Sequence, residues 1–502
     1  MFRESIIYIL SRVLPSIITL ATGVTLTWLL KPEQYGVYGL GMGLVGMICS
    51  GFFGWHTMSF ARFYQSGAEN PKYLPTVVQT FVMLCGVSIV FAIIAAVGFG
   101  IFGALTPEYR VLLLICVPGG WCYSWFELAA RMQVVRFRPM SFFWMNLLRN
   151  VGILVLGLLL AWATHSPYYV LVGSFTAMLV SALVFNSGGL DLRPRLFDRD
   201  VCWSLLKFGW PIAFVQVLGS FSFLIDRLLL DALSGPAEVG FYTVAYSLSQ
   251  TTIMTIGSGI DSAIYSRTVR ASDSGDAKAF HDQLAKSCIL LLGLLAPASI
   301  GAAMVAPTLA RILVAPEYIE PVGQIIAWVS IGALIFGFRA YYVDHAFHFG
   351  GSTRPLTLVI IVMVGTNVIC DLLLIPKYGA VGTGMAGIAA AVLSFIHCVI
   401  AARTRMRLPF PLRDIAKIGI ATLAMALFLW PLHRQTGADV MQALGFPAPD
   451  AHWKIRAINI TVLAFQVAGG ALVYGLTATA LDLMGLRARV RGSFGMLLRR
   501  AG

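Results

Sequence analysis

The residues of this chain best suited to chemistry are ionisable side chains inside long apolar stretches. Arg149, Arg227 and Arg339 have this setting. A charged side chain in hydrocarbon costs about 2.5–3.5 kcal/mol on insertion scales, so each arginine needs a partner or a water-filled cavity. Arginine keeps its charge and can bind a phosphate through two parallel hydrogen bonds. The three arginines therefore predict either an anionic ligand in a cavity or structural ion pairs.

Three carboxylates share this setting and leave the same two interpretations open. Asp226, Asp261 and Asp371 lie within apolar stretches, where each serves either a cavity or a structural pair. Asp226 directly precedes Arg227, but neighbouring residues on a helix point about 100° apart. We therefore expect Asp226 and Arg227 to contact different partners. Glu127 lies near the end of an apolar stretch, where we expect water to solvate it.

Two further patterns suggest a cofactor or a metal, but their context favours packing. Gly41, Gly43 and Gly46 match GxGxxG, which binds dinucleotides only between a strand and a helix. Here the glycines lie in an apolar stretch, where small residues permit close helix packing. His345 and His348 have no third firm ligand nearby, so we expect interfacial residues. The sequence thus predicts no metal site and no cofactor.

The elements that must position these residues are membrane-spanning helices. Of the 502 residues, 58% are apolar and 12% are charged, against about 25% charged residues in soluble domains. Charges gather between apolar runs of about 18–27 residues, and about 20 residues cross a bilayer as a helix. We predict an all-α polytopic membrane protein with about fourteen transmembrane helices. The predicted spans are 9–30, 36–57, 76–102, 111–130, 142–162, 168–186, 209–230, 239–265, 288–314, 322–343, 356–375, 381–401, 415–432 and 458–480.

The basic residues predict the orientation of these spans. The net charge is +13, which in a soluble protein would raise the question of nucleic acid. In this chain most Lys and Arg residues fall in the loops of one side, and loops rich in Lys and Arg stay in the cytoplasm. We therefore predict a multi-pass protein of the bacterial inner membrane with both termini cytoplasmic, surrounded by membrane lipids and without a nucleic-acid partner.

Several short phrases occur twice in the same order. Residues 32–38 (PEQYGVY) correspond to 236–242 (PAEVGFY), and the phrase PEY occurs at both 107–109 and 316–318. Internal repeats of this kind are typical of transporters that move a substrate between two faces of a bilayer. We predict an N-lobe at 1–200 with spans one to six and a C-lobe at 201–405 with spans seven to twelve. The two lobes would be related by a pseudo-twofold axis with the pathway between them. Residues 406–502 would hold spans thirteen and fourteen and a basic cytoplasmic tail.

The chain resembles the Wzx-type polysaccharide flippases of the multidrug/oligosaccharidyl-lipid/polysaccharide exporter superfamily. The resemblance covers nearly the whole chain through the order and spacing of its motifs. They are Arg12, 29–38 (LLKPEQYGVY), 226–230 (DRLLL), 239–242 (VGFY) and 378–382 (YGAVG).

The resemblance implies a V-shaped pair of six-helix lobes that works by alternating access as an antiporter, without enzymatic activity. The implied cargo is an undecaprenyl-diphosphate-linked oligosaccharide, moved to the periplasmic leaflet for exopolysaccharide, capsule or lipopolysaccharide O-antigen synthesis. A polymerase and a chain-length regulator of the same pathway are the implied partners. Arg227 and Arg12 are the implied cavity cations, joined by Arg149 and Arg339 from the charge argument. A proton or sodium gradient is implied, with Asp226, Asp261 and Asp371 as candidates for ion coupling.

Three other functions remain open at this point. A multidrug exporter of the same superfamily is expected to have fewer spans and a less basic cavity. A lipid II flippase shares the number of spans and an anionic cargo, but a cluster of arginines in the first spans is not evident here. A membrane-embedded glycosyltransferase or polymerase needs a large periplasmic loop with catalytic groups, whereas the loop around 433–456 is short and has only Asp439 and Asp450 as acids.

Overall fold

The computed structural model describes residues 2–67, 69–101, 107–185, 196–349, 354–433, 435, 439, 452–485 and 487. The regular elements among these residues are all helices, and no strand occurs. Eleven helices in the described part are long and apolar enough to cross a membrane. The predicted all-α polytopic membrane fold is confirmed.

The number of spans depends on how three segments are counted. The first helix contributes only the short apolar stretch Leu14–Leu26, and the helix Pro236–Asp273 is not among the eleven. The stretch Pro355–Arg403 counts once, although Gly379 has the non-helical angles φ 54° and ψ −135° within it. A positive φ suits glycine because it has no Cβ. The predicted total of about fourteen spans stays a prediction.

The chain divides into two compact units, Met1–Thr243 and Val244–Gly502. The lobe boundaries predicted from the repeat stay a prediction. In the first unit the elements are α1 (Phe2–Leu26), α2 (Pro32–Ile48), the π-helix η1 (Cys49–Gly54), α3 (Trp55–Gly67), α4 (Tyr73–Ile101), α5 (Pro107–Val135), α6 (Pro139–Thr164), α7 (Pro167–Phe185) and α8 (Arg199–Ser234). The first residues of α9 (Pro236–Asp273) complete it.

Proline marks the start of five of these helices, namely α2, α5, α6, α7 and α9. A helix leaves its first backbone N–H groups without internal partners, so the missing N–H of proline costs nothing there. The prolines of the repeated phrases 32–38 and 236–242 are two of these helix starts. The phrases therefore act as signals that begin a helix.

Glycines in α2 and α5 allow these helices to lie close to their neighbours. A Cβ added at Gly41 would lie 2.6 Å from Leu171 of α7, and one at Gly119 would lie 2.3 Å from Phe175 of the same helix. A Cβ at Gly43 would lie 3.1 Å from Leu224 of α8. Gly41 and Gly43 thus agree with the interpretation of GxGxxG as a packing motif, whereas an added Cβ at Gly46 would meet nothing within 4 Å.

The two repeated phrases meet within the first unit. A Cβ at Gly36 would lie 1.9 Å from the carbonyl oxygen of Pro236. A Cβ at Gly240 would lie 2.1 Å from the carbonyl oxygen of Pro32. The contact is reciprocal, as in an interface in which the same surface meets itself about a twofold axis. Glycine at both positions is what permits this backbone-to-backbone approach.

The second unit contains the rest of α9 and the elements that follow. These are α10 (Ala277–Leu313), the 3₁₀-helix η3 (Pro316–Tyr318), α11 (Ile319–Phe338), the π-helix η4 (Arg339–Val343), α12 (His345–Phe349), α13 (Arg354–Arg403), α14 (Leu412–Leu429), η5 (Trp430–Leu432), α16 (His452–Ala480) and η6 (Leu483–Gly485).

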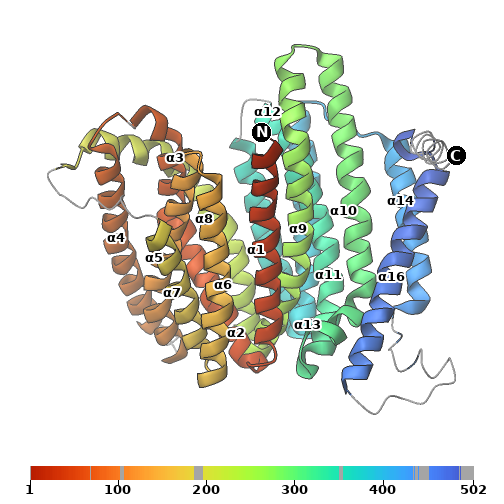
Figure 1. The fold of residues 1–502 in the computed structure, drawn as a ribbon, viewed down its shortest axis with the longest axis horizontal. Coiled ribbons are helices and arrows are strands. Elements are labelled where there is room, and N and C mark those ends of the chain that lie inside the picture. Colours follow the sequence, from red (N-terminus) through yellow and green to blue (C-terminus); the bar gives the residue numbers. More distant parts are fainter. Residues whose placement is uncertain are drawn as a thin grey trace. The chain divides into compact units, whose positions relative to one another are not determined.

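The last two long helices, α14 and α16, pack against each other and against α10 (Figure 1). Ile289 of α10, Ala421 of α14 and Ala478 of α16 belong to one buried cluster. The hydroxyl of Tyr474 donates a hydrogen bond of 2.7 Å to the carbonyl oxygen of Gly293. The last two helices are therefore anchored on α10 by both apolar and polar contacts.

Candidate functional site

A polar cavity of about 410 Å³ lies in the first unit, bordered by α2, η1, α3, α5 and α8. Its volume falls within the roughly 300–1,000 Å³ common for ligand pockets. The polar and charged residues of its lining are Ser50, Thr57, Tyr123, Glu127, Arg131, Gln216 and Ser220. The cavity therefore offers hydroxyl and amide groups, one carboxylate and one guanidinium.

The π-helix η1 shapes one wall of this cavity. π-Helical turns interrupt α-helices at functional sites because they change the direction of the side chains that follow. Ser50 lies in η1, and its hydroxyl accepts a hydrogen bond of 2.6 Å from Ser220 of α8. A Cβ at Gly54 would lie 2.0 Å from Gln216 Oε1, so glycine leaves room for this amide. The π-helix and Gly54 together give Gln216 its place in the lining.

The charge of the cavity comes from α5 and is influenced by α6. Glu127 and Arg131 lie one turn apart on α5, and Arg131 makes no hydrogen bond or ion pair within the described part of the chain. Arg149 Nη1 of α6 lies 3.7 Å from Glu127 Oε1, and its guanidinium lies 4.5 Å above the ring of Phe126. The side chain of Glu127 is 39% exposed, so water can reach it as expected, and Arg149 also approaches it from the neighbouring helix. Arg149 thus lies outside the lining as the partner of Glu127, whereas Arg131 belongs to the lining.

Arg227 and Asp226 of α8 lie outside this lining. The side chain of Arg227 is 2% exposed, and Nη1 donates a hydrogen bond of 2.7 Å to the Phe223 carbonyl oxygen. Its guanidinium lies 3.7 Å from the ring centre of Phe223 and 5.5 Å from that of Tyr242. The hydroxyl of Tyr242 donates to Asp226 Oδ2 at 3.3 Å. The two side chains do not have wholly different partners as predicted, because Tyr242 is long enough to offer its ring to one and its hydroxyl to the other.

Asp261 and His345 form a second charged group, in the second unit. His345 Nε2 of α12 lies 3.2 Å from Asp261 Oδ1 of α9, and the His345 ring lies 5.3 Å from the ring of Tyr265. His345 is 7% exposed, whereas His348 is exposed. The side of α12 that carries His345 faces α9, and the interfacial position of both histidines stays a prediction.

Arg339 is the first residue of η4 and is 4% exposed. Its guanidinium lies 5.0 Å from the ring centre of Phe336, and its Nε and Nη1 have no hydrogen-bond acceptor among the described residues. Asp344, just after η4, accepts a hydrogen bond of 3.1 Å from Cys398 Sγ of α13. The structure thus places a buried cation in the segment that leads to His345.

Asp371 and Arg12 are the two remaining predicted site residues, and the structure describes the side chain of Asp371 but not that of Arg12. Asp371 of α13 is 0% exposed, and its Oδ2 accepts a hydrogen bond of 2.9 Å from Asn367 Nδ2, one turn before it. Arg12 lies in α1, and its side chain lies outside the described residues. No group of three or more His, Cys, Asp or Glu residues suited to a metal occurs among the residues searched.

The sequence analysis did not single out Ser50, Gln216 or Ser220. Uncharged polar residues are common in membrane helices, so their type alone carries little information. The spacing of Ser50, Gly54 and Thr57 places these small or polar residues on one helical face, and this spacing was the available signal. The lining becomes visible only when α8 is placed beside η1.

The fold and this cavity define a helical membrane protein with an open pocket that carries polar and charged side chains. The profile of the polysaccharide biosynthesis protein family matches residues 25–323, more than half of the chain, and the chain belongs to this family. No curated protein matches the chain in sequence.

Two groups of solved structures share the fold. The lipid II flippase MurJ in an inward closed conformation is similar with a TM-score of 0.73 at 16% identity, with 96% of this chain and 99% of that chain covered. An inward-facing multidrug resistance MATE family transporter of the MOP superfamily has a TM-score of 0.59 at 14% identity, with 78% and 94% covered. The outward-facing conformation of such a transporter gives 0.55 at 13% identity, with 80% and 94% covered. The fold is therefore the one shared by these transporters.

Proposed function

We propose that the protein is a flippase that moves undecaprenyl-diphosphate-linked oligosaccharide repeat units from the cytoplasmic to the periplasmic leaflet of the bacterial inner membrane. The observation that carries this proposal is the fold match with a lipid II flippase over nearly the whole of both chains. Membership of the polysaccharide biosynthesis protein family supports an oligosaccharide as the transported group. Flipping by alternating access moves the cargo without making or breaking a covalent bond.

The polar cavity of the first unit supports the cargo that we propose. Sugars offer hydroxyl groups, which Ser50, Gln216 and Glu127 can bind through hydrogen bonds. A diphosphate is anionic, and the guanidinium of Arg131 can bind it through parallel hydrogen bonds. Arg149 would act through Glu127 by partly neutralising its charge. A carboxylate and a cation within one lining suit a ligand that is part sugar and part phosphate.

The other predicted cations would have different roles in this proposal. Arg227 would fix α8 to the start of α9, because its guanidinium lies against Phe223 and Tyr242. Arg339 would supply a second cationic position, in the second unit. Arg12 would line the inner entrance, as the resemblance implies. Both termini would be cytoplasmic, and a polymerase and a chain-length regulator would receive the flipped unit.

We propose a proton as the coupling ion, carried by Asp261 and His345. An imidazole and a carboxylate in contact can pass a proton between them, and this pair, 3.2 Å apart, is partly shielded from solvent. The titratable and charged groups around the pair are Tyr265 of α9, Arg339, Asp344 and His348 of η4 and α12, and Cys398 of α13. Asp226 and Asp371 are held by Tyr242 and Asn367, so they are weaker candidates.

The test of cargo is flipping in proteoliposomes by the purified full chain. A lipid-linked oligosaccharide, lipid II and a cationic dye would be supplied in separate experiments. We expect the lipid-linked oligosaccharide to be flipped fastest. Preference for lipid II would support the alternative that its fold relative suggests, and export of the dye alone would support a multidrug exporter.

The test of the site compares Arg131 of α5 with Arg136, which directly follows that helix. Arg131→Gln should weaken cargo binding roughly 10- to 100-fold, because hydrogen bonds to charged groups contribute about 1.5–3 kcal/mol. Arg136→Gln is the control, since Arg136 lies outside the lining and its Nε donates to the Tyr64 hydroxyl at 3.0 Å. Equal binding by both variants would remove the cavity from the transport pathway.

The test of coupling compares gradients and histidines. A proton gradient, and not a sodium gradient, should accelerate flipping by the wild-type protein. His345→Asn and Asp261→Asn should each abolish this acceleration, whereas His281→Asn, at an exposed position of α10, should keep it. Acceleration by sodium, or its persistence in His345→Asn, would refute the proposed proton site.

A further inference from the structure

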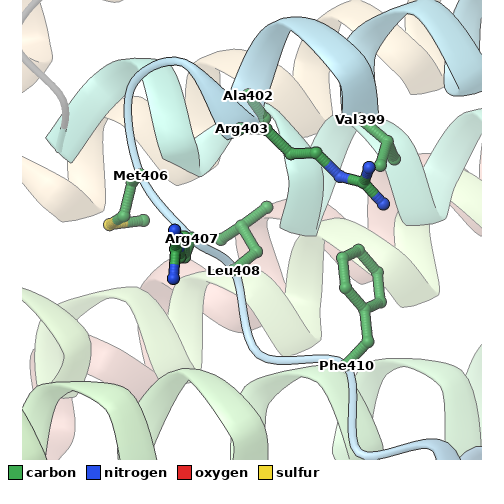
Figure 2. A pocket seen from close by; sticks show the side chains of 7 residues that line it. All are labelled: Val399, Ala402, Arg403, Met406, Arg407, Leu408 and Phe410. Carbon is green, nitrogen blue, oxygen red and sulfur yellow. The ribbon is translucent and has the colours of Figure 1, made fainter.

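A second cavity, of about 400 Å³, lies in the second unit between the end of α13 and the start of α14. Figure 2 shows its seven lining residues, which come from the last turns of α13 and from the connector that follows. The side chains of Val399, Ala402, Met406, Leu408 and Phe410 form its apolar part. Among the described residues of the lining, Arg403 and Arg407 are charged and none is a carboxylate.

The connector combines partly buried apolar residues with exposed basic residues. Met406, Leu408 and Phe410 pack against the main buried cluster of the second unit. Arg405 and Arg407, between and beside them, are exposed. The segment therefore presents guanidinium groups along the edge of an apolar wall.

Two hydrogen bonds and a ring contact hold the apolar wall of this cavity in place. The hydroxyl of Tyr342, which is 0% exposed, donates a hydrogen bond to the carbonyl oxygen of Pro409. The rings of Tyr342 and Phe410 are in edge contact, with 5.8 Å between their centres. The backbone N–H of Met406 donates to the carbonyl oxygen of Ala402 at 2.9 Å. The cavity is thus formed in advance, so a ligand would not need to order the connector.

The position of the cavity brings it to the level of lipid headgroups. The apolar stretch Pro355–Arg403 ends at one side of it, and Leu412–Leu432 begins at the other. Neither Arg403 nor Arg407 makes a hydrogen bond or ion pair within the described part of the chain. The nearby Asp414 instead lies 3.5 Å from Lys417. Two guanidinium groups with free hydrogen-bond donors therefore face the boundary between membrane and water.

We propose that this cavity binds the headgroup of an anionic phospholipid. The phosphate would accept hydrogen bonds from Arg403 and Arg407, and the first acyl carbons would lie against Val399, Leu408 and Phe410. Basic pockets between membrane helices on the cytoplasmic side bind such headgroups. The distribution of basic loops predicts that this side is cytoplasmic. The site is separate from the transported cargo and does not depend on the proposed flippase activity.

Native mass spectrometry of the purified full chain tests the proposal. Phosphatidylglycerol, phosphatidylcholine and inorganic phosphate would be titrated in separate experiments. Phosphatidylglycerol should bind most tightly, and R403Q/R407Q should weaken it roughly 25-fold, or about fivefold for each arginine at an anionic membrane surface. Arg405→Gln is the matched control, because Arg405 is exposed in the same connector but is not part of the lining.

Each other outcome overturns a definite part of the proposal. Unchanged phosphatidylglycerol binding by R403Q/R407Q, with folding verified by an unaltered thermal transition, would remove the cavity as the site. Equal binding of phosphatidylcholine would show that headgroup charge is not recognised. Displacement of phosphatidylglycerol by inorganic phosphate at comparable concentration would identify a site for free phosphate instead of a lipid.

Discussion

The contact between the two repeated phrases makes a quantitative prediction about Gly36 and Gly240. An alanine at Gly36 would place its Cβ 1.9 Å from the Pro236 carbonyl oxygen, and one at Gly240 would place it 2.1 Å from that of Pro32. Real Cβ atoms do not approach other atoms closer than 3.0 Å, so each methyl group requires a displacement of about 1 Å. The obstacle is backbone at a helix start, which cannot rotate away as a side chain can.

The displacement determines the expected loss of stability. Inserting a methyl group into a packed contact costs about 1–3 kcal/mol, so Gly36→Ala and Gly240→Ala should each lower the unfolding free energy by this amount. One separation of α2 from α9 relieves both clashes. The double variant should therefore lose clearly less than the sum of the two single losses, because the sites share one contact.

Reversible unfolding in mixed detergent micelles measures these losses. Gly86→Ala in α4 is the matched control, because no atom lies within 4 Å of its added Cβ. It should lose no stability. If Gly36→Ala were as stable as Gly86→Ala, or if the double variant lost the full sum, the reciprocal contact would be refuted.

Three tyrosine hydroxyls give the remaining predictions, each measured by the same unfolding experiment. Tyr109→Phe removes a hydrogen bond of 2.5 Å to Asp231 Oδ2 and should cost about 1.5–3 kcal/mol, the range for a charged partner. Tyr242→Phe removes a longer bond, of 3.3 Å, to Asp226 Oδ2 and should cost less, so a larger loss than for Tyr109→Phe would contradict the geometry. Tyr342→Phe should cost about 1–3 kcal/mol and also weaken phosphatidylglycerol binding, because it leaves the connector carbonyl without its donor. Unaltered lipid binding in this variant would show that the connector needs no such anchor.

Local features of the sequence predicted where the helices lie better than they predicted the irregular turns within them. The predicted span 36–57 corresponds to the helix that runs from Pro32 through η1 to Gly67. Its start is marked by a proline, which sequence reveals directly. The π-helix η1 inside it has no comparable signal, because a π-turn is stabilised by what packs against it and not by a residue type. The sequence therefore did not reveal that η1 forms one wall of the cavity in the first unit.

The partners of the charged residues could not be predicted from the sequence either. Arg149 was correctly expected to need a partner, but Glu127 lies on a different helix, and only the packing of α5 and α6 brings the two within 3.7 Å. His345 was expected at the interface, and the orientation of α12 turns it to Asp261. A rotation of about 100° per residue separates a buried from an exposed position on a helix. Sequence periodicity cannot fix that rotation when most faces of a helix are apolar.

The sequence by itself determined that this is a helical membrane protein with an internal repeat. A span satisfies its own backbone hydrogen bonds in hydrocarbon, so apolar length and composition are sufficient to specify it. Tertiary structure alone decided that Arg149 meets Glu127 and that Asp261 meets His345. It also decided that the two repeated phrases contact each other. These encounters depend on how neighbouring helices are rotated and spaced. That arrangement is set by side-chain packing between segments far apart in the chain.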